Sequence, residues 1–164
     1  MASFAYGFGN DPLPIHSVLK VEDEEKPWQE AEAKLPDFPK DEDLLEFYVS
    51  ATTTNRFFID GKTIAADPDG VVRFTMVVKT SGGATNISYE GIRCGTSETK
   101  LYATGVKGAW VPSRVSAWKP IENKPMNRQH AALNRDYFCP ASIPIRSAEE
   151  GRNALKRGKH PDAL

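Results

Sequence analysis

The sequence has only two cysteines among its 164 residues, Cys94 and Cys139, and it has no long apolar run. A helix that crosses a bilayer needs about 20 predominantly apolar residues, which argues against a membrane-spanning chain. The formal net charge is only -1, so the sequence also lacks the strongly basic character that is typical of nucleic-acid binding. We therefore expect neither a membrane-spanning protein nor a partner among nucleic acids.

Motifs for metals and cofactors are missing as well. There is no C-x₂-C pair, and His130 and His160 have no partners at the spacing of zinc ligands. Gly7-Phe8-Gly9 neither follows a predicted strand nor opens a helix, as a dinucleotide-binding motif would. Asp67-Pro68-Asp69-Gly70 lacks the glutamate of a calcium loop and is typical of a turn. We expect no metal and no cofactor.

What is present is the composition of a globular protein, with 40% apolar and 26% charged residues. The sequence predicts an irregular, partly docked N-terminal arm over residues 1–43, because prolines recur there too often for long helices. Within the arm, Trp28 should dock on the core and residues 28–34 could form two helical turns. Residues 44–158 are predicted to form a single domain, and residues 159–164 a frayed polar tail.

The middle of the chain predicts an antiparallel sheet. Residues 71–80 (VVRFTMVVKT) alternate between two faces, and this pattern is typical of a half-buried strand with one apolar face. Turn signals at Asp60-Gly61 and Ser81–Gly83 leave no room for helices between neighbouring strands. Gly91 interrupts the next strand and suggests a bulge. The predicted fold class is α+β, an antiparallel β-sheet of about five to seven strands with two C-terminal helices packed on it.

Two helices are predicted near the C-terminus. A helical wheel over residues 126–138 places one apolar face beside a second mixed face. The first face contains Met126, His130, Leu133 and Tyr137. Ser147 and Glu150 form a capping-box pattern before a helix over residues 148–157, and Gly158 is expected to end it.

The segment Asn127–Pro140 combines residue types that occur in active sites. One hypothesis is a small hydrolase with Cys94 as nucleophile, His130 as base and Asn134 as the residue that orients it. His130 lies on the apolar face of the predicted helix, however, where a packed core residue is the commoner outcome. The two cysteines leave two possibilities open, a disulfide closing a loop of about 45 residues or two separate buried thiols.

Tryptophan and arginine are favoured at protein interfaces. A binding surface near the helix is therefore a second hypothesis, although core packing by the tryptophans is the commoner explanation. The candidate binding residues are Arg93, Arg114, Trp118, Arg128 and Arg135.

Several phrases in order carry a family resemblance: EFYVSATTTNRFFIDG, DGVVRFTMVVKTSGGATNISYEGIRC, AWKPIENKPMNRQHAALNRDYFCP and AEEGRNALKRG. Over roughly residues 28–158 the chain resembles the cryptic-neisserial-protein-like family of proteobacteria. The resemblance implies a small exported envelope protein, lipid-anchored to the outer membrane in some members, and it supplies no catalytic residues. Residues 1–10 have neither the basic start nor the apolar core of a leader, so we expect a mature chain from which the leader is absent.

The oxidising periplasm that this resemblance implies favours a Cys94–Cys139 disulfide, which would leave Cys94 a poor nucleophile. The expected function is that of a non-enzymatic periplasmic or envelope-associated protein that binds a partner protein or an envelope component. The alternatives are the hydrolase that uses His130 and a small-ligand binder with a pocket between sheet and helix.

Overall fold

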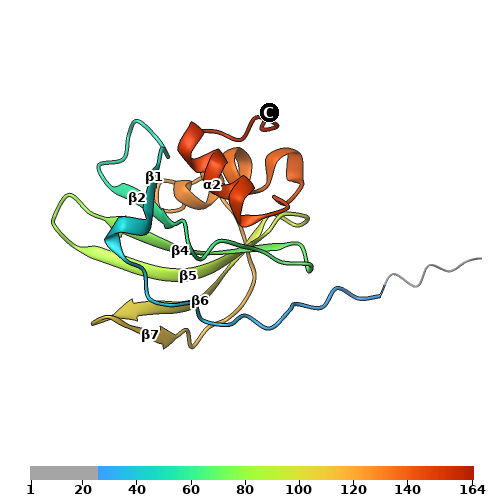
Figure 1. The fold of residues 1–164 in the computed structure, drawn as a ribbon, viewed down its shortest axis with the longest axis horizontal. Coiled ribbons are helices and arrows are strands. Elements are labelled where there is room, and N and C mark those ends of the chain that lie inside the picture. Colours follow the sequence, from blue (N-terminus) through green and yellow to red (C-terminus); the bar gives the residue numbers. More distant parts are fainter. Residues whose placement is uncertain (1–25) are drawn as a thin grey trace, which may run out of the picture.

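The computed structural model describes residues 26–164, in which an antiparallel sheet carries helices on one face (Figure 1). This arrangement confirms the predicted α+β class. The longer strands follow the order β1-β2-β4-β5-β6-β7, while the short strands β3 and β8 pair with β4 and β6. The strands are β1 (Leu44–Phe47), β2 (Arg56–Asp60), β3 (Ala65–Ala66), β4 (Val71–Lys79), β5 (Thr85–Arg93), β6 (Glu98–Val106), β7 (Ala109–Pro112) and β8 (Lys119–Pro120).

The helical elements follow the sheet in the sequence, apart from the single turn η1 (Asp41–Asp43). The predicted first helix is α1 (Arg128–Ala132), which continues directly as the π-helix η2 (Leu133–Phe138) and then the 3₁₀ turn η3 (Pro140–Ser142). Phe138 packs against Phe74 of β4 with ring centroids 5.4 Å apart. This contact joins the helical layer to the centre of the sheet.

The second helix, α2 (Ala148–Arg157), has the predicted ends. The Ser147 hydroxyl accepts a hydrogen bond from the backbone N–H of Glu150 at 3.1 Å, which satisfies one of the free donors in the first turn. Gly158 follows the helix with φ of 82°, a left-handed conformation that glycine adopts at little cost.

Strand β4 is buried on both faces, so the prediction of a half-buried strand was wrong. Phe74 and Met76 lie in the core beneath the helices, as predicted, but Arg73, Thr75 and Val77 on the opposite face are also buried. The N-terminal arm contributes to this burial by lying across the face that the helices leave free (Figure 1). A strand covered on both sides does not separate an apolar face from a solvated one.

The described part of the arm, residues 26–40, is extended, so the expectation of two helical turns was wrong. Its polar groups bond to the sheet instead of to one another: the Trp28 indole N–H donates to the carbonyl of Asp69, and the N–H of Ala31 donates to the Asp69 carboxylate. Phe38 packs on Trp110 and lies so close to Gly105 that a Cβ there would stand 2.9 Å from its ring. Trp28 does hold the arm to the folded domain, but it docks on the outer face of the sheet and not on the main hydrophobic core. Residues 1–25 lie outside the described part of the chain.

The C-terminal residues are also anchored, contrary to the expectation of a frayed tail. His160 is buried, its Nε2 lies 2.8 Å from a carboxylate oxygen of Glu150, and its backbone N–H donates to the carbonyl of Asp136 at 2.7 Å. Glu150 belongs to α2 and Asp136 belongs to η2. The tail therefore ties the two helical segments together.

Candidate functional site

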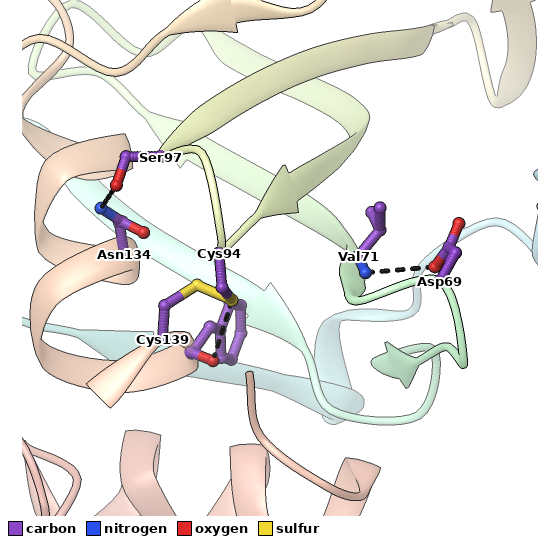
Figure 2. The surroundings of a disulfide bond; sticks show 7 residues. Asp69, Val71, Cys94, Ser97, Asn134 and Cys139 are labelled. Carbon is purple, nitrogen blue, oxygen red and sulfur yellow. Dashed lines mark hydrogen bonds between the residues drawn. A yellow bond between two sulfur atoms is a disulfide. The ribbon is translucent and has the colours of Figure 1, made fainter. Parts of the chain in front are cut away.

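Cys94 and Cys139 form a disulfide with their Cα atoms 5.4 Å apart, which confirms the pairing that the family resemblance implied. The bond connects the end of β5 to the end of η2 (Figure 2). Both residues are buried in the main hydrophobic core. Because its sulfur is bonded, Cys94 has no thiolate to act as a nucleophile in this state.

A largely buried pair of titratable side chains lies between β5 and α1. His130 Nε2 is hydrogen-bonded to Glu90 Oε1 at 2.9 Å, and the Ser88 hydroxyl donates to the other carboxylate oxygen at 3.1 Å. Only 14% of the His130 side chain and 8% of the Glu90 side chain are exposed. Burial alone would lower the pKa of His130, but the hydrogen bond and the negative charge of Glu90 outweigh it, so its pKa lies above the usual value.

The alternation of β5 explains why Glu90 points toward the helix. Ile92 and Glu90 are two residues apart and share the helix-covered face, whereas Gly91 and Tyr89 face the arm. The register shifts between Tyr89 and Glu90, where β6 contributes an additional residue, Tyr102. The irregularity suggested at Gly91 is therefore present one residue earlier, and the extra residue belongs to the neighbouring strand.

The pair lines a pocket of about 530 Å³ between the sheet, the segment after β7 and the start of α1. The pocket combines apolar walls with polar groups. The lining residues are Glu90, Thr99, Leu101, Ser113, Val115, Ala117, Lys119, Pro120, Ile121, Glu122, Asn127 and His130.

A second, larger groove of about 760 Å³ adjoins this pocket and shares Glu90, Leu101 and His130 with it. It extends over the inner face of β4 to β6 towards Met126, whose side chain is 86% exposed. The Glu90–His130 pair thus lies where the two depressions meet. Its position makes it accessible to a ligand although its own side chains are largely buried.

Asn134, the other catalytic candidate, is engaged by a different residue. Its side-chain amide donates to the Ser97 hydroxyl at 3.4 Å beside the disulfide (Figure 2), and in the described part of the chain no hydrogen bond joins it to His130. Within residues 26–164, no hydroxyl or thiol is hydrogen-bonded to His130. The arrangement is that of a carboxylate–histidine pair, which can exchange a proton or bind a polar group, without the assembled Cys94–His130–Asn134 triad.

The candidate binding residues lie in three separate places. Arg93 stacks over the Trp28 ring at 3.7 Å, and Trp118 packs edge-on against the same ring at a centroid distance of 5.9 Å. These two hold the arm. Arg128 and Arg135 line a groove on the far side of α1, and Arg114 is exposed in the segment after β7.

A buried ionic cluster at the arm was missed by the sequence reasoning. The Arg73 guanidinium contacts the carboxylates of Asp67 and Asp69 at 2.6 and 2.8 Å. Tyr102 accepts from Arg73 and donates to Glu30. Burial alone would lower the pKa of Arg73, but its bonds to Asp69 and Asp67 raise it overall. The sequence does contain a signal for this cluster: Asp69 and Asp67 lie in a turn, four and six residues before Arg73 on an apolar strand.

Residues 23–156 match the model of the CNP1-like family. The chain belongs to the CNP1-like family. It is similar to cryptic neisserial protein 1 of Neisseria gonorrhoeae (strain ATCC 700825 / FA 1090), with 26% identity over 163 residues that cover 87% of this chain and 80% of the relative. No solved structure matches. Within residues 26–164 of this family member, no helix has the length and apolarity that a membrane crossing requires.

The disulfide and the relative from a Gram-negative bacterium are together consistent with a location outside the cytoplasm. Structural disulfides persist in oxidising compartments and are rare where thiols are kept reduced. The names of the family and of the neisserial relative state no activity. The pocket of this CNP1-like chain is therefore the main structural indication of its function.

Proposed function

We propose that this CNP1-like chain is a non-enzymatic binding protein of the periplasm that holds a small amphipathic envelope component in the pocket between the sheet and α1. The observation that supports this most directly is the Glu90–His130 pair at the base of a pocket of about 530 Å³. Ligand pockets commonly have volumes of roughly 300–1,000 Å³ and combine apolar walls with a few polar groups. This pocket has both properties.

The two kinds of lining define the chemistry of the ligand. Leu101, Val115 and Ile121 provide apolar contacts, and burying an apolar body against such walls is favourable by about 25 cal/mol per Å². His130 and Lys119 provide polar contacts, and Glu90 and Glu122 are the carboxylates in the same lining. A histidine with a perturbed pKa in a cleft is a recognised indicator of a functional site. A molecule with an apolar body and one polar or anionic group fits this division.

Binding without catalysis is supported by what surrounds His130. Its Nε2 is engaged by Glu90, Cys94 is committed to the disulfide, and Asn134 is bonded to Ser97. A nucleophile within hydrogen-bond reach of the base is the usual signature of covalent catalysis. The carboxylate–histidine pair serves a binding role in this proposal, as a largely buried polar anchor in a pocket that also has apolar walls.

The location is supported by the disulfide and by the relationship to the neisserial protein. A component of the envelope, such as an amphipathic molecule that is sparingly soluble in water, would meet the protein in that compartment. Such a molecule needs a carrier or a receptor with an apolar cavity.

The test uses 1-anilinonaphthalene-8-sulfonate, a fluorescent probe with an aromatic body and one anionic group. We expect saturable binding to the oxidised wild-type protein. Ala117→Trp, which places a large side chain in the pocket lining, should weaken binding by about tenfold or more, corresponding to about 1.4 kcal/mol.

The matched control is Ala109→Trp, which places the same side chain at an exposed position of β7 that does not line the pocket. It should leave the affinity of the probe within about twofold of wild type. Equal affinities of wild type and Ala117→Trp would refute the pocket as the binding site. Native mass spectrometry of the protein purified from envelope extracts then identifies the bound component by its mass.

A further inference from the structure

A third depression lies on the other side of α1, and its chemistry differs from that of the pocket. Arg128 and Arg135 are seven residues apart in the sequence, yet both line one groove of about 380 Å³. The opposite wall is the chain after β1, residues 48–52. Asn127 and His130 line the pocket, whereas Arg128 and Ala131 line this groove. Helix α1 therefore separates the pocket of about 530 Å³ from the arginine groove.

The lining of this groove is cationic and rich in hydrogen-bond donors. No aspartate or glutamate is among its lining residues. The residues are Tyr48, Val49, Ser50, Ala51, Thr52, Asn123, Arg128, Ala131, Ala132 and Arg135. Two guanidinium groups, a side-chain amide and a phenol offer donors that an anion can accept.

Both arginines have surroundings that suit an anionic ligand. Arg128 donates to the hydroxyl groups of Ser50 and Thr52, which orient its guanidinium without neutralising the charge. Arg135 donates two hydrogen bonds to the Asp136 carboxylate; the Arg135 side chain is 57% exposed and that of Asp136 is 20% exposed. Solvent screens the exposed guanidinium. A phosphate, which carries more charge than a carboxylate, can therefore compete with Asp136 for Arg135.

We propose that this groove binds a phosphate group, with Arg128 and Arg135 as its two cationic ligands. A guanidinium presents planar, paired donors that match the oxygens of a phosphate, which explains the preference for arginine at such sites. No carboxylate is among the residues that line the groove, and the Asp136 carboxylate contacts Arg135 from outside that lining. The phosphate can belong to a lipid headgroup or to a soluble phosphorylated molecule, since both present the same oxygens.

The test is a titration of ¹⁵N-labelled full-length, oxidised protein with inorganic phosphate, followed by NMR. Amide signals of residues 48–52 and 128–135 should shift together with one dissociation constant. Arg135→Gln should weaken binding by about tenfold or more, because hydrogen bonds between charged groups are stronger than those of neutral groups. Arg135 is the decisive position because its side chain is exposed, whereas Arg128 also holds the loop.

The matched control is Arg114→Gln, which removes the same charge from an exposed position outside the groove. It should bind phosphate as wild type does. Co-sedimentation with phosphatidylglycerol vesicles, compared with phosphatidylcholine vesicles, separates the two sources. Binding to the anionic vesicles that Arg135→Gln weakens supports a lipid headgroup, and binding to phosphate alone supports a soluble ligand. No binding to either probe, or equal losses in Arg135→Gln and Arg114→Gln, would overturn the proposal.

Discussion

Replacing Arg73 by methionine tests whether the buried ionic cluster fixes the N-terminal arm to the sheet. The guanidinium is only 2% exposed and contacts Asp67 and Asp69 directly, with Glu30 at 3.5 Å. It also donates to the carbonyl of Ala31, so one side chain connects β4, the turn before it and the arm. Methionine has a comparable apolar stem but leaves Asp67 and Asp69 without their cation, whereas Glu30 keeps its ion pair with Lys100 at 2.6 Å.

The expected loss follows from these contacts. Breaking a buried ion pair by removing one partner costs about 3–5 kcal/mol, because the remaining charge is buried without compensation. For a chain of this size each kcal/mol corresponds to roughly 2–4 °C, so Tm should fall by roughly 6–20 °C. The pKa of Asp69 is informative here: burial alone would raise it, but its bonds to Arg73 and to backbone N–H groups lower it overall. Removing Arg73 should raise that pKa.

The assay is urea unfolding of the oxidised protein, together with limited trypsin digestion. Lys34 is already exposed on the arm, so release of the arm from the sheet should free the backbone around it and give earlier cleavage there in Arg73→Met. Arg73→Lys keeps the positive charge but loses the planar, paired N–H donors of the guanidinium. Its stability should therefore lie between that of wild type and that of Arg73→Met. Arg114→Met, at an exposed position, should change stability by no more than about 0.5 kcal/mol. An Arg73→Met protein within about 1 kcal/mol of wild type, with unchanged digestion, would refute the reasoning.

Three further predictions concern other parts of the fold. Cys139→Ser should destabilise the oxidised protein by about 2–5 kcal/mol, and an unchanged Tm would contradict a stabilising disulfide. The pKa of His130 is raised in the folded state, so its ion pair with Glu90 should contribute fully to stability below about pH 6.5. That contribution should be lost as the pH rises through the folded pKa. The stability difference between wild type and His130→Gln should therefore shrink between about pH 6 and 9, and a constant difference would count against the pair. Gly91→Ala would place a Cβ 2.9 Å from the Tyr102 hydroxyl and should cost about 1–3 kcal/mol in urea unfolding, whereas Gly82→Ala, whose nearest neighbour is 3.9 Å away, should be nearly neutral.

The sheet could be predicted because its information is local. Alternation in residues 71–80 and the turn signals around them define β4 and its neighbours, and the capping pattern at Ser147 defines the start of α2. The first C-terminal helix was predicted from its apolar face, but its second half is a π-helix. Its wider turn allows Tyr137 and Phe138 both to be buried. A wheel of 3.6 residues per turn does not represent this geometry.

The contacts that form the candidate site depend on distant parts of the chain. Glu90 and His130 are 40 residues apart and meet only when the helical layer packs on the sheet. Arg73 was assigned to the solvent face because strand alternation contains no information about an arm that covers that face. The arm's path is set by single contacts, such as the one between Phe38 and Trp110. Such contacts leave no periodic signal in the sequence.

The Cys94–Cys139 bond makes the pocket-bearing segment a covalent ring. Apart from Glu90, every residue that lines the pocket lies between the two cysteines in the sequence. A proteolytic cut in the exposed stretch around Arg114 therefore cannot release a fragment: the two new chain ends stay joined through sulfur, and the walls of the pocket remain in one molecule. Where proteases are present and disulfides are not reduced, the residues that line the pocket therefore stay in one covalent molecule after a backbone bond between the two cysteines has been cleaved.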